Sequence, residues 1–277
     1  MQPSQLLSAL SSPPALTLGV TLLAFAVLWS ISLRGRDCGI VDLYWAAGFP
    51  VIGWLELALG PPPRMSQILF MTLVTVWATR LGAHLAIRHM QSEAEDPRYR
   101  AMRDQHGDAW PMRSLWMVFM VQAVVLWLVA APIHFAMAPG AGDAPPVVVV
   151  IAITLFGVGF VVESVADSAL AAFRRSPANR GRILTTGIFA WSRHPNYFGE
   201  AVLWWGLGIL ALGMTGQILT LAGPALLTLL LLKVSGIPPL EAHLSARPGF
   251  AAYAAQVPAF VPRPPKSAGS KPAARDA

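Results

Sequence analysis

The stretch VVVVIAITLFGVGFVVESVA, residues 147–166, carries a single charge, that of Glu163. About 20 apolar residues are needed to cross the hydrocarbon core of a bilayer, so this stretch predicts a transmembrane helix. Other stretches share its character. We predict seven spans, at Leu16–Ser32, Ile40–Leu59, Ser66–Ala86, Leu115–Ala138, Val147–Ala166, Ala201–Leu212 (beginning about one turn earlier, near Asn196) and Gln217–Lys233.

Composition agrees with a membrane protein. The chain has 277 residues, of which 55% are hydrophobic and only 12% charged, and its mean hydropathy is +0.55. Soluble domains have about 25% charged residues. We therefore predict an all-α, polytopic integral membrane protein, which excludes a secreted disulfide scaffold, a disordered interaction chain and a soluble two-domain enzyme. Cys38 is the one cysteine, so neither a disulfide within the chain nor a metal site is predicted.

The arginines and lysines predict the orientation. They gather in the first, third and fifth loops and in the C-terminal region, whereas the N-terminal segment and the other loops carry only Arg64. Because cytoplasmic loops are enriched in Arg and Lys, we predict that the N-terminus lies outside and the C-terminus inside, as in a bacterial inner membrane. This topology also accounts for the net charge of +6 without a nucleic-acid partner.

The predicted organisation has three parts. Residues 1–15 form an N-terminal segment, residues 16–261 a membrane domain, and residues 262–277 a tail. The tail is rich in Pro, Lys, Ala and Ser, and we predict that it is disordered. Within the third loop, Asp96 followed by Pro97 predicts the N-cap and first residue of a short helix.

Ionisable residues inside the spans indicate a site, because a charge in the bilayer is costly. With the predicted topology, Asp42, Arg80, His84, Glu163, Asp167, Glu200 and Lys233 all lie toward the cytoplasm. Only Glu56 lies toward the opposite face, and we interpret it and His134 as structural. A charge near a span end can also snorkel to the interface, which is our interpretation of Lys233 and Arg88. The other residues predict a cytoplasm-facing cavity beneath the arginine-rich loop 173–194, which suits a phosphate-bearing cofactor.

The motif GIFAWSRHPNYFGE, residues 187–200, followed by Trp204-Trp205-Gly206, resembles the steroid 5α-reductase-like membrane proteins. More closely, it is similar to their bacterial branch, the domain of unknown function 1295 family. The resemblance extends over roughly residues 34–262, and residues 147–261 correspond to the C-terminal half of the reductases. It implies a seven-helix fold, NADPH bound in a cytoplasm-facing cavity, and reduction of a carbon–carbon double bond in a hydrophobic lipid or steroid-like substrate.

The resemblance also implies roles for single residues. Asn196 and Glu200 match residues at the nicotinamide end, and Tyr253 matches a tyrosine that closes the cofactor pocket. The remaining residues that we assign to cofactor binding are Arg80, His84, Glu163, Asp167, Arg174, Arg182, Arg193, His194 and Tyr197.

The residues expected at the substrate end of the site differ from those of the reductases, which polarise the substrate carbonyl with a hydrogen-bonded tyrosine and glutamate. Trp77 stands where that tyrosine is expected, and Asp42 is the nearest counterpart of the glutamate. We therefore predict that Asp42 and Tyr44 supply the catalytic acid.

Two alternatives remain open. Prenylcysteine and phospholipid methyltransferases, which use S-adenosylmethionine, share the Arg-His-Pro-x-Tyr-x-Gly string, although only Glu241 stands where they carry an acidic pair. The other alternative is a non-enzymatic protein that binds lipid. In each case the partners are membrane lipid and a hydrophobic small molecule, and the sequence indicates no protein partner.

Overall fold

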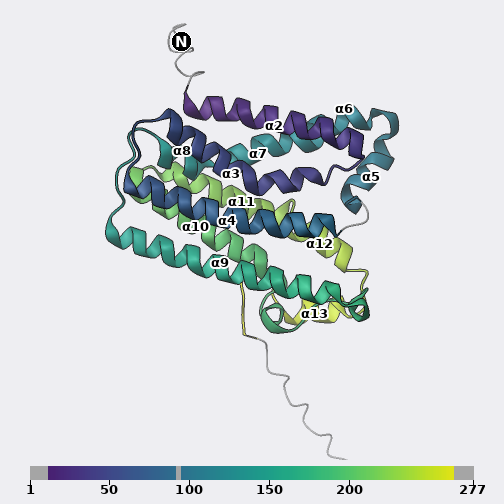
Figure 1. Cartoon of the computed structure of the whole chain (residues 1–277). Coiled ribbons are helices and arrows are strands. Elements are labelled where there is room, and N and C mark those ends of the chain that lie inside the picture. Colours follow the sequence, from purple (N-terminus) through teal and green to yellow (C-terminus); the bar gives the residue numbers. More distant parts are fainter. Residues whose placement is uncertain (1–11, 92–94, 265–277) are drawn as a thin grey trace, which may run out of the picture. The chain divides into compact units, whose positions relative to one another are not determined.

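The computed structural model describes residues 12–91 and 95–264, and within these residues the regular structure is entirely helical (Figure 1). The elements are α2 (Pro13–Gly35), α3 (Ile40–Leu59), α4 (Met65–Met90), α5 (Pro97–His106), η1 (Gly107–Ala109), α6 (Trp110–Ser114), the π-helical η2 (Leu115–Met120), α7 (Val121–Val129), α8 (Ala131–Met137), α9 (Pro146–Arg175), η3 (Pro177–Asn179), η4 (Gly187–Ala190), α10 (Pro195–Thr215), η5 (Ile218–Leu221), α11 (Ala222–Lys233), α12 (Ile237–Leu244) and α13 (Phe250–Gln256).

The described residues contain seven helices long and apolar enough to cross a membrane, which confirms the predicted all-α class and number of spans. Large apolar side chains are exposed along these helices. Leu23 on α2 is 67% exposed and Val150 on α9 is 64% exposed. Such exposure along a whole helix is expected where lipid replaces water. The predicted orientation remains a prediction.

Two predicted spans differ from the helices. The span expected at Leu115–Ala138 breaks at Ala130, between α7 and α8, because Pro132 has no backbone N–H and its ring would clash with the preceding turn. The span expected to end at Ala166 continues to Arg175, so Arg174, expected in the loop 173–194, lies on a helix. Hydropathy marks where apolar sequence ends, whereas α9 ends only shortly before Pro177.

The chain divides into two compact units. Unit 1 comprises the described residues up to Thr154 together with Trp205–Leu226, and unit 2 comprises Leu155–Trp204 together with the described residues from Leu227 on. Of the predicted terminal parts, residues 1–11 and 265–277 lie outside the described residues. Within the start of the predicted tail, the backbone N–H of Arg263 donates to the carbonyl of Trp191 at 2.9 Å.

The core of unit 1 is aromatic. Phe49 on α3 and Trp77 on α4 are fully buried, and their ring centroids lie 5.7 Å apart. Glycines let α3 pack closely: a Cβ atom at Gly48 would lie 2.7 Å from Leu126 Cδ1. Trp77, which replaces the tyrosine expected from the resemblance, is therefore a packing residue of this core.

In unit 2, α9 and α10 touch through their backbones. A Cβ atom at Gly199 on α10 would lie 2.6 Å from both the amide nitrogen of Glu163 and the carbonyl oxygen of Gly159 on α9. Small residues at such crossings let membrane helices approach closely. This crossing places Asp167 near the first turn of α10, where Asn196 lies.

We therefore expect Gly199→Ala to destabilise the protein by about 1–3 kcal/mol, because the added methyl group meets backbone that cannot rotate away. Thermal unfolding in detergent measures the change. Gly157→Ala is the matched control, since a Cβ atom at Gly157, also on α9, would meet nothing within 4 Å. Equal unfolding temperatures for the two variants would show that the helices do not cross at Gly199.

Candidate functional site

Two predicted cofactor residues meet in unit 2. Asn196 on α10 donates from Nδ2 to Asp167 Oδ1 on α9 at 3.2 Å, and Asp167 is buried. Glu163, one turn before Asp167, is buried as well, and Glu200 is half-buried one turn after Asn196. The predicted proximity of these polar residues is therefore found, while their role in binding a cofactor stays a prediction.

Arg193 and His194, which were predicted to bind the cofactor, make hydrogen bonds to other residues of unit 2. Arg193 binds both carboxylate oxygens of Glu241, from Nε at 2.7 Å and from Nη2 at 3.1 Å. Its Nη1 atom donates to the carbonyls of Ala254, at 3.0 Å, and Val257. His194 Nε2 lies 2.9 Å from Glu241 Oε1. In this structure the Arg-His pair joins the start of α10 to α12 and to the end of α13.

Tyr197 extends this cluster, because its ring stacks on that of His194 with the centroids 5.6 Å apart. Burial lowers the pKa of His194 below its ordinary value of 6.5, although the hydrogen bond to Glu241 opposes the shift. His194 is therefore neutral at pH 7, with Nε2–H donating to the carboxylate.

Tyr253, predicted to close the cofactor pocket, is bonded to backbone. Its hydroxyl group donates to the carbonyl of Phe189, in η4, at 2.6 Å. Burial raises the pKa of Tyr253 to about 12, so the phenol stays protonated at neutral pH. This bond holds α13 against the turn that precedes the Arg-His-Pro motif.

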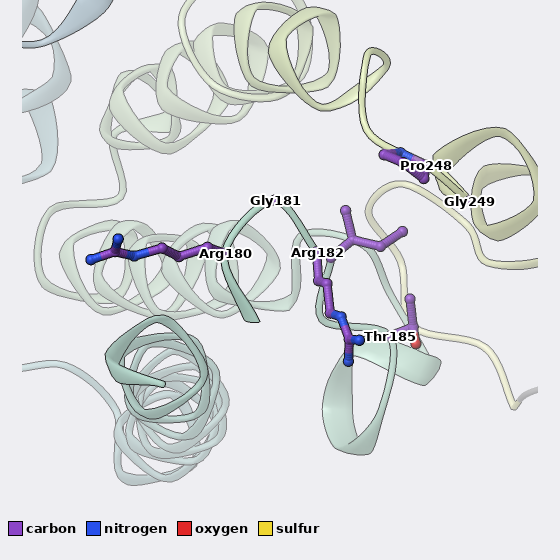
Figure 2. Close-up of a pocket in the computed structure, with 7 residues that line it drawn as sticks. Arg180, Gly181, Arg182, Thr185, Pro248 and Gly249 are labelled. Carbon is purple, nitrogen blue, oxygen red and sulfur yellow. The ribbon is translucent and has the colours of Figure 1, made fainter. Parts of the chain in front are cut away.

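A recess of about 610 Å³ opens in unit 2 beside the arginine-rich loop. It is lined by Arg180, Gly181, Arg182, Ile183 and Thr185 on one side and by Pro248 and Gly249 on the other (Figure 2). Arg247 joins the two sides, since its Nη1 atom donates to the carbonyl of Arg182 at 2.9 Å. Gly181 has a φ of 76°, which the tight turn between the two lining arginines requires.

The recess contains one residue of the predicted set, Arg182. Figure 2 shows the side chains of Arg180 and Arg182 leaving the loop in different directions. Arg174, also predicted to bind the cofactor, is exposed near the end of α9. Guanidinium groups, a threonine hydroxyl group and glycine backbone are the donors that phosphate oxygens take in proteins, so the lining fits a phosphate-bearing group.

The predicted catalytic pair, Asp42 and Tyr44, lies in unit 1, but the tyrosine that is hydrogen-bonded to Asp42 is Tyr99. Asp42 Oδ1 accepts a hydrogen bond from the hydroxyl group of Tyr99 at 3.3 Å, and Tyr99 in turn accepts one from Gln122 Nε2 at 3.2 Å. The ring of Tyr44 instead packs edge-to-face on Phe25. Among the described residues, Tyr99 is thus the phenol that reaches Asp42.

The sequence contained an indirect signal for the position of Tyr99, namely the helix N-cap predicted at Asp96. The expected cap of α5 is confirmed, because Asp96 Oδ1 accepts from the backbone N–H of Arg98 at 2.9 Å. Burial raises the pKa of Asp96, but the hydrogen bonds from Arg98 outweigh it and lower the pKa overall. Arg98 Nη2 also lies 3.4 Å from Asp42 Oδ2. The cap therefore fixes where Tyr99, three residues after Asp96, enters the structure.

Arg80 and His84 lie one turn apart on α4, in unit 1, and both are half-buried. The helix places them on one face. The other predicted cofactor residues lie in unit 2. Among the described residues, no group of three or more His, Cys, Asp or Glu side chains is arranged to hold a metal ion.

The cluster around His194 predicts a pH dependence of stability. Because burial lowers the pKa of His194 in the folded protein, the unfolded chain binds a proton first as the pH falls below about 6.5. Stability is therefore expected to fall from that pH down to the folded-state pKa. Thermal unfolding measured across this range should show the loss in wild type and in His106→Gln, and a smaller loss in His194→Gln. If stability falls equally steeply with pH in all three proteins, His194 is not the group that causes the loss.

Comparison with known proteins places the chain in a family. A family model described as "Protein of unknown function (DUF1295)" matches residues 28–257. An uncharacterized protein of Schizosaccharomyces pombe is 28% identical over 203 residues, which cover 64% of this chain and 58% of that protein. The "Probable O-methyltransferase ustE" of Ustilaginoidea virens is 37% identical over 60 residues, 22% of this chain and 21% of that protein.

The matches thus span less than two thirds of either relative's length. No solved structure matches. Since the matched region covers most of the chain, including the Arg-His-Pro-Asn-Tyr motif, the protein belongs to the family described as Protein of unknown function (DUF1295).

Proposed function

We propose that this protein is a membrane-embedded reductase that binds NADPH and reduces a carbon–carbon double bond in a hydrophobic, lipid or steroid-like substrate. The observation that carries the proposal is the recess at Arg180–Thr185, whose lining suits the phosphates of a dinucleotide. Arg182 is the residue there that the resemblance also assigns to the cofactor. NADPH, when bound, supplies a hydride ion.

Asn196 is the residue that we assign to the nicotinamide carboxamide. Its bond to Asp167 uses one of the two amide N–H groups and fixes the orientation of the side chain. A side-chain amide held in this way presents both an acceptor and a donor, which is the pattern that another carboxamide requires. Asp167 is then a positioning residue that acts through Asn196.

The proton that completes the reduction comes, in this proposal, from Tyr99. Its phenol is bonded to Asp42 and Gln122, which hold the hydroxyl group in place between an acceptor and a donor. To reach the substrate, this proton leaves its hydrogen bond to Asp42, and the resulting phenolate keeps the hydrogen bond from the Gln122 amide N–H, while Arg98 offsets the charge of the neighbouring Asp42 carboxylate. Arg98 lies over the Tyr99 ring, with its Cζ atom 5.4 Å from the centroid.

One observation favours a second function, methyl transfer from S-adenosylmethionine. The 60-residue match is to a protein whose name states a reaction, probable O-methyl transfer, and Glu241 is the acidic residue that this alternative needs. A test of cofactor binding with both NADPH and S-adenosylmethionine separates the two functions.

Calorimetry in detergent should show saturable binding of NADPH, and Arg182→Gln should weaken it about tenfold, since one charge-assisted phosphate contact is lost. Arg175→Gln is the matched control, because Arg175 is exposed at the end of α9 and does not line the recess. Asn196→Ala is also expected to weaken binding. Binding of S-adenosylmethionine without NADPH binding would overturn the reductase and establish the methyltransferase alternative.

Tyr99→Phe should lower the rate by about 10²–10⁴-fold, the usual contribution of a general acid, while leaving NADPH affinity unchanged. The measurement is oxidation of NADPH by a steroidal enone in detergent. Tyr44→Phe removes the hydroxyl group that the sequence suggested as the acid. If that variant shows the larger loss, Tyr44 rather than Tyr99 is the donor.

A further inference from the structure

A second recess, of about 330 Å³, lies in unit 1 at the end of α2. Its volume falls near the lower limit of small-molecule sites, which is about 300 Å³. None of the residues that line it belongs to the site assigned to NADPH, so a ligand bound here is independent of the proposed reductase. The lining includes Leu33, Arg36, Cys38, Arg103, Asp108 and Trp110.

Two arginines give the recess a phosphate-binding side. Arg36 is exposed at the C-cap of α2. Arg103, on α5, is held in place because its Nη2 atom donates to the carbonyl of Arg36 at 2.8 Å and to Glu95 Oε1 at 2.6 Å. Both bonds use Nη2, so they do not consume the Nη1 edge of the guanidinium group. Two guanidinium groups at one recess suit the oxygens of a phosphate ester.

The same recess also carries an acidic and an aromatic side chain. Asp108, on η1, is exposed, and Trp110, at the start of α6, is buried. A carboxylate binds an ammonium ion by hydrogen bonds, and the Trp110 ring, which stacks on His106 with the centroids 6.2 Å apart, lines the recess beside it. The lining therefore presents positive charge and negative charge together, which favours a zwitterion over a simple anion.

Exposed apolar side chains lie on the elements that form the recess, as expected for a site at the lipid boundary. Leu33 lines it and is 37% exposed, and Met112 and Trp116, which follow Trp110 along the chain, are 59% and 62% exposed. Trp29 on α2 donates from its indole nitrogen to the carbonyl of Pro111 at 2.8 Å. Tryptophans at the end of an apolar helix are typical of the membrane interface.

We propose that this recess binds a phospholipid headgroup of the ethanolamine class, with the phosphate against Arg36 and Arg103 and the primary ammonium hydrogen-bonded to Asp108. Choline headgroups lack N–H groups and cannot donate to Asp108, and glycerol headgroups carry no cation. The site therefore distinguishes lipids of equal chain length by their headgroups alone.

Cys38 provides the readout, since it is the one cysteine of the chain and lines the recess. Burial and the nearby Glu95 charge raise the pKa of its thiol, so modification is slow and sensitive to access. The measurement is the rate of modification by a neutral disulfide reagent, in the full chain in detergent, with phospholipids that carry ethanolamine, choline or glycerol headgroups. The ethanolamine lipid is expected to protect at about tenfold lower concentration than the choline lipid, a ratio equivalent to ~1.4 kcal/mol.

Variants test the two ends of the headgroup separately. Asp108→Asn should make the ethanolamine and choline lipids protect equally, and Arg36→Gln should weaken protection by both. The controls are Asp104→Asn and Arg34→Gln. Both residues are exposed and close in sequence to the residues tested, but they do not line the recess, so each lipid should protect these variants as it protects wild type. The unfolding temperature of each variant without lipid establishes that it is folded.

The last part of the experiment repeats the measurement with soluble phosphoethanolamine in place of the lipid. Protection by the lipid alone identifies a headgroup, whereas equal protection by the soluble compound identifies a free phosphate ester of the same chemistry. The proposal is overturned if ethanolamine and choline lipids protect wild type equally, if the glycerol lipid protects as well as the ethanolamine lipid, or if Asp108→Asn behaves as Asp104→Asn does.

Discussion

The bidentate ion pair between Arg193 and Glu241 is the interaction on which unit 2 depends. Charges close to a membrane are costly unless they find partners within the protein. Here both carboxylate oxygens are occupied by one guanidinium group, His194 adds a third hydrogen bond, and the remaining arginine donors bind backbone carbonyls near the end of α13. One residue at the start of α10 thus fixes two C-terminal helices, and removing either charge leaves the other half-buried without an opposite charge.

Unit 1 meets the same constraint with Glu56 and His134, the pair interpreted as structural. Glu56 is 2% exposed, and its Oε1 atom lies 2.6 Å from His134 Nδ1 and 2.7 Å from the hydroxyl group of Thr17. His134 Nε2 lies 3.0 Å from the carbonyl of Trp127, which can only accept, so Nε2 carries a proton. The pair joins α2, α3 and α8 and belongs to neither proposed site.

Features encoded locally were predictable. Apolar length predicted the spans, the Asp96 cap predicted α5, and polar residues near the ends of the spans predicted that Asn196 and Asp167 lie at one level, where the structure shows them in contact. Contacts between distant residues were not. Tyr99 meets Asp42 across 57 positions of sequence, and only the docking of α5 brings them together. The break at Ala130 was predictable in principle, because Pro132 carries its cause, but hydropathy does not register it.

The ion pair of Arg193 with Glu241 also bears on the choice of cofactor. A sulfonium cation would be attracted by a carboxylate that is otherwise unneutralised, yet Glu241 already has a guanidinium group on both oxygens. Binding a cation there would require that pair to separate, together with the carbonyl contacts that Arg193 makes. The arginines lining the recess of unit 2, in contrast, favour an anion and need no rearrangement of this cluster. Electrostatic complementarity is therefore our reason for proposing a dinucleotide phosphate rather than S-adenosylmethionine, since the ion pair that stabilises unit 2 already neutralises the carboxylate of Glu241.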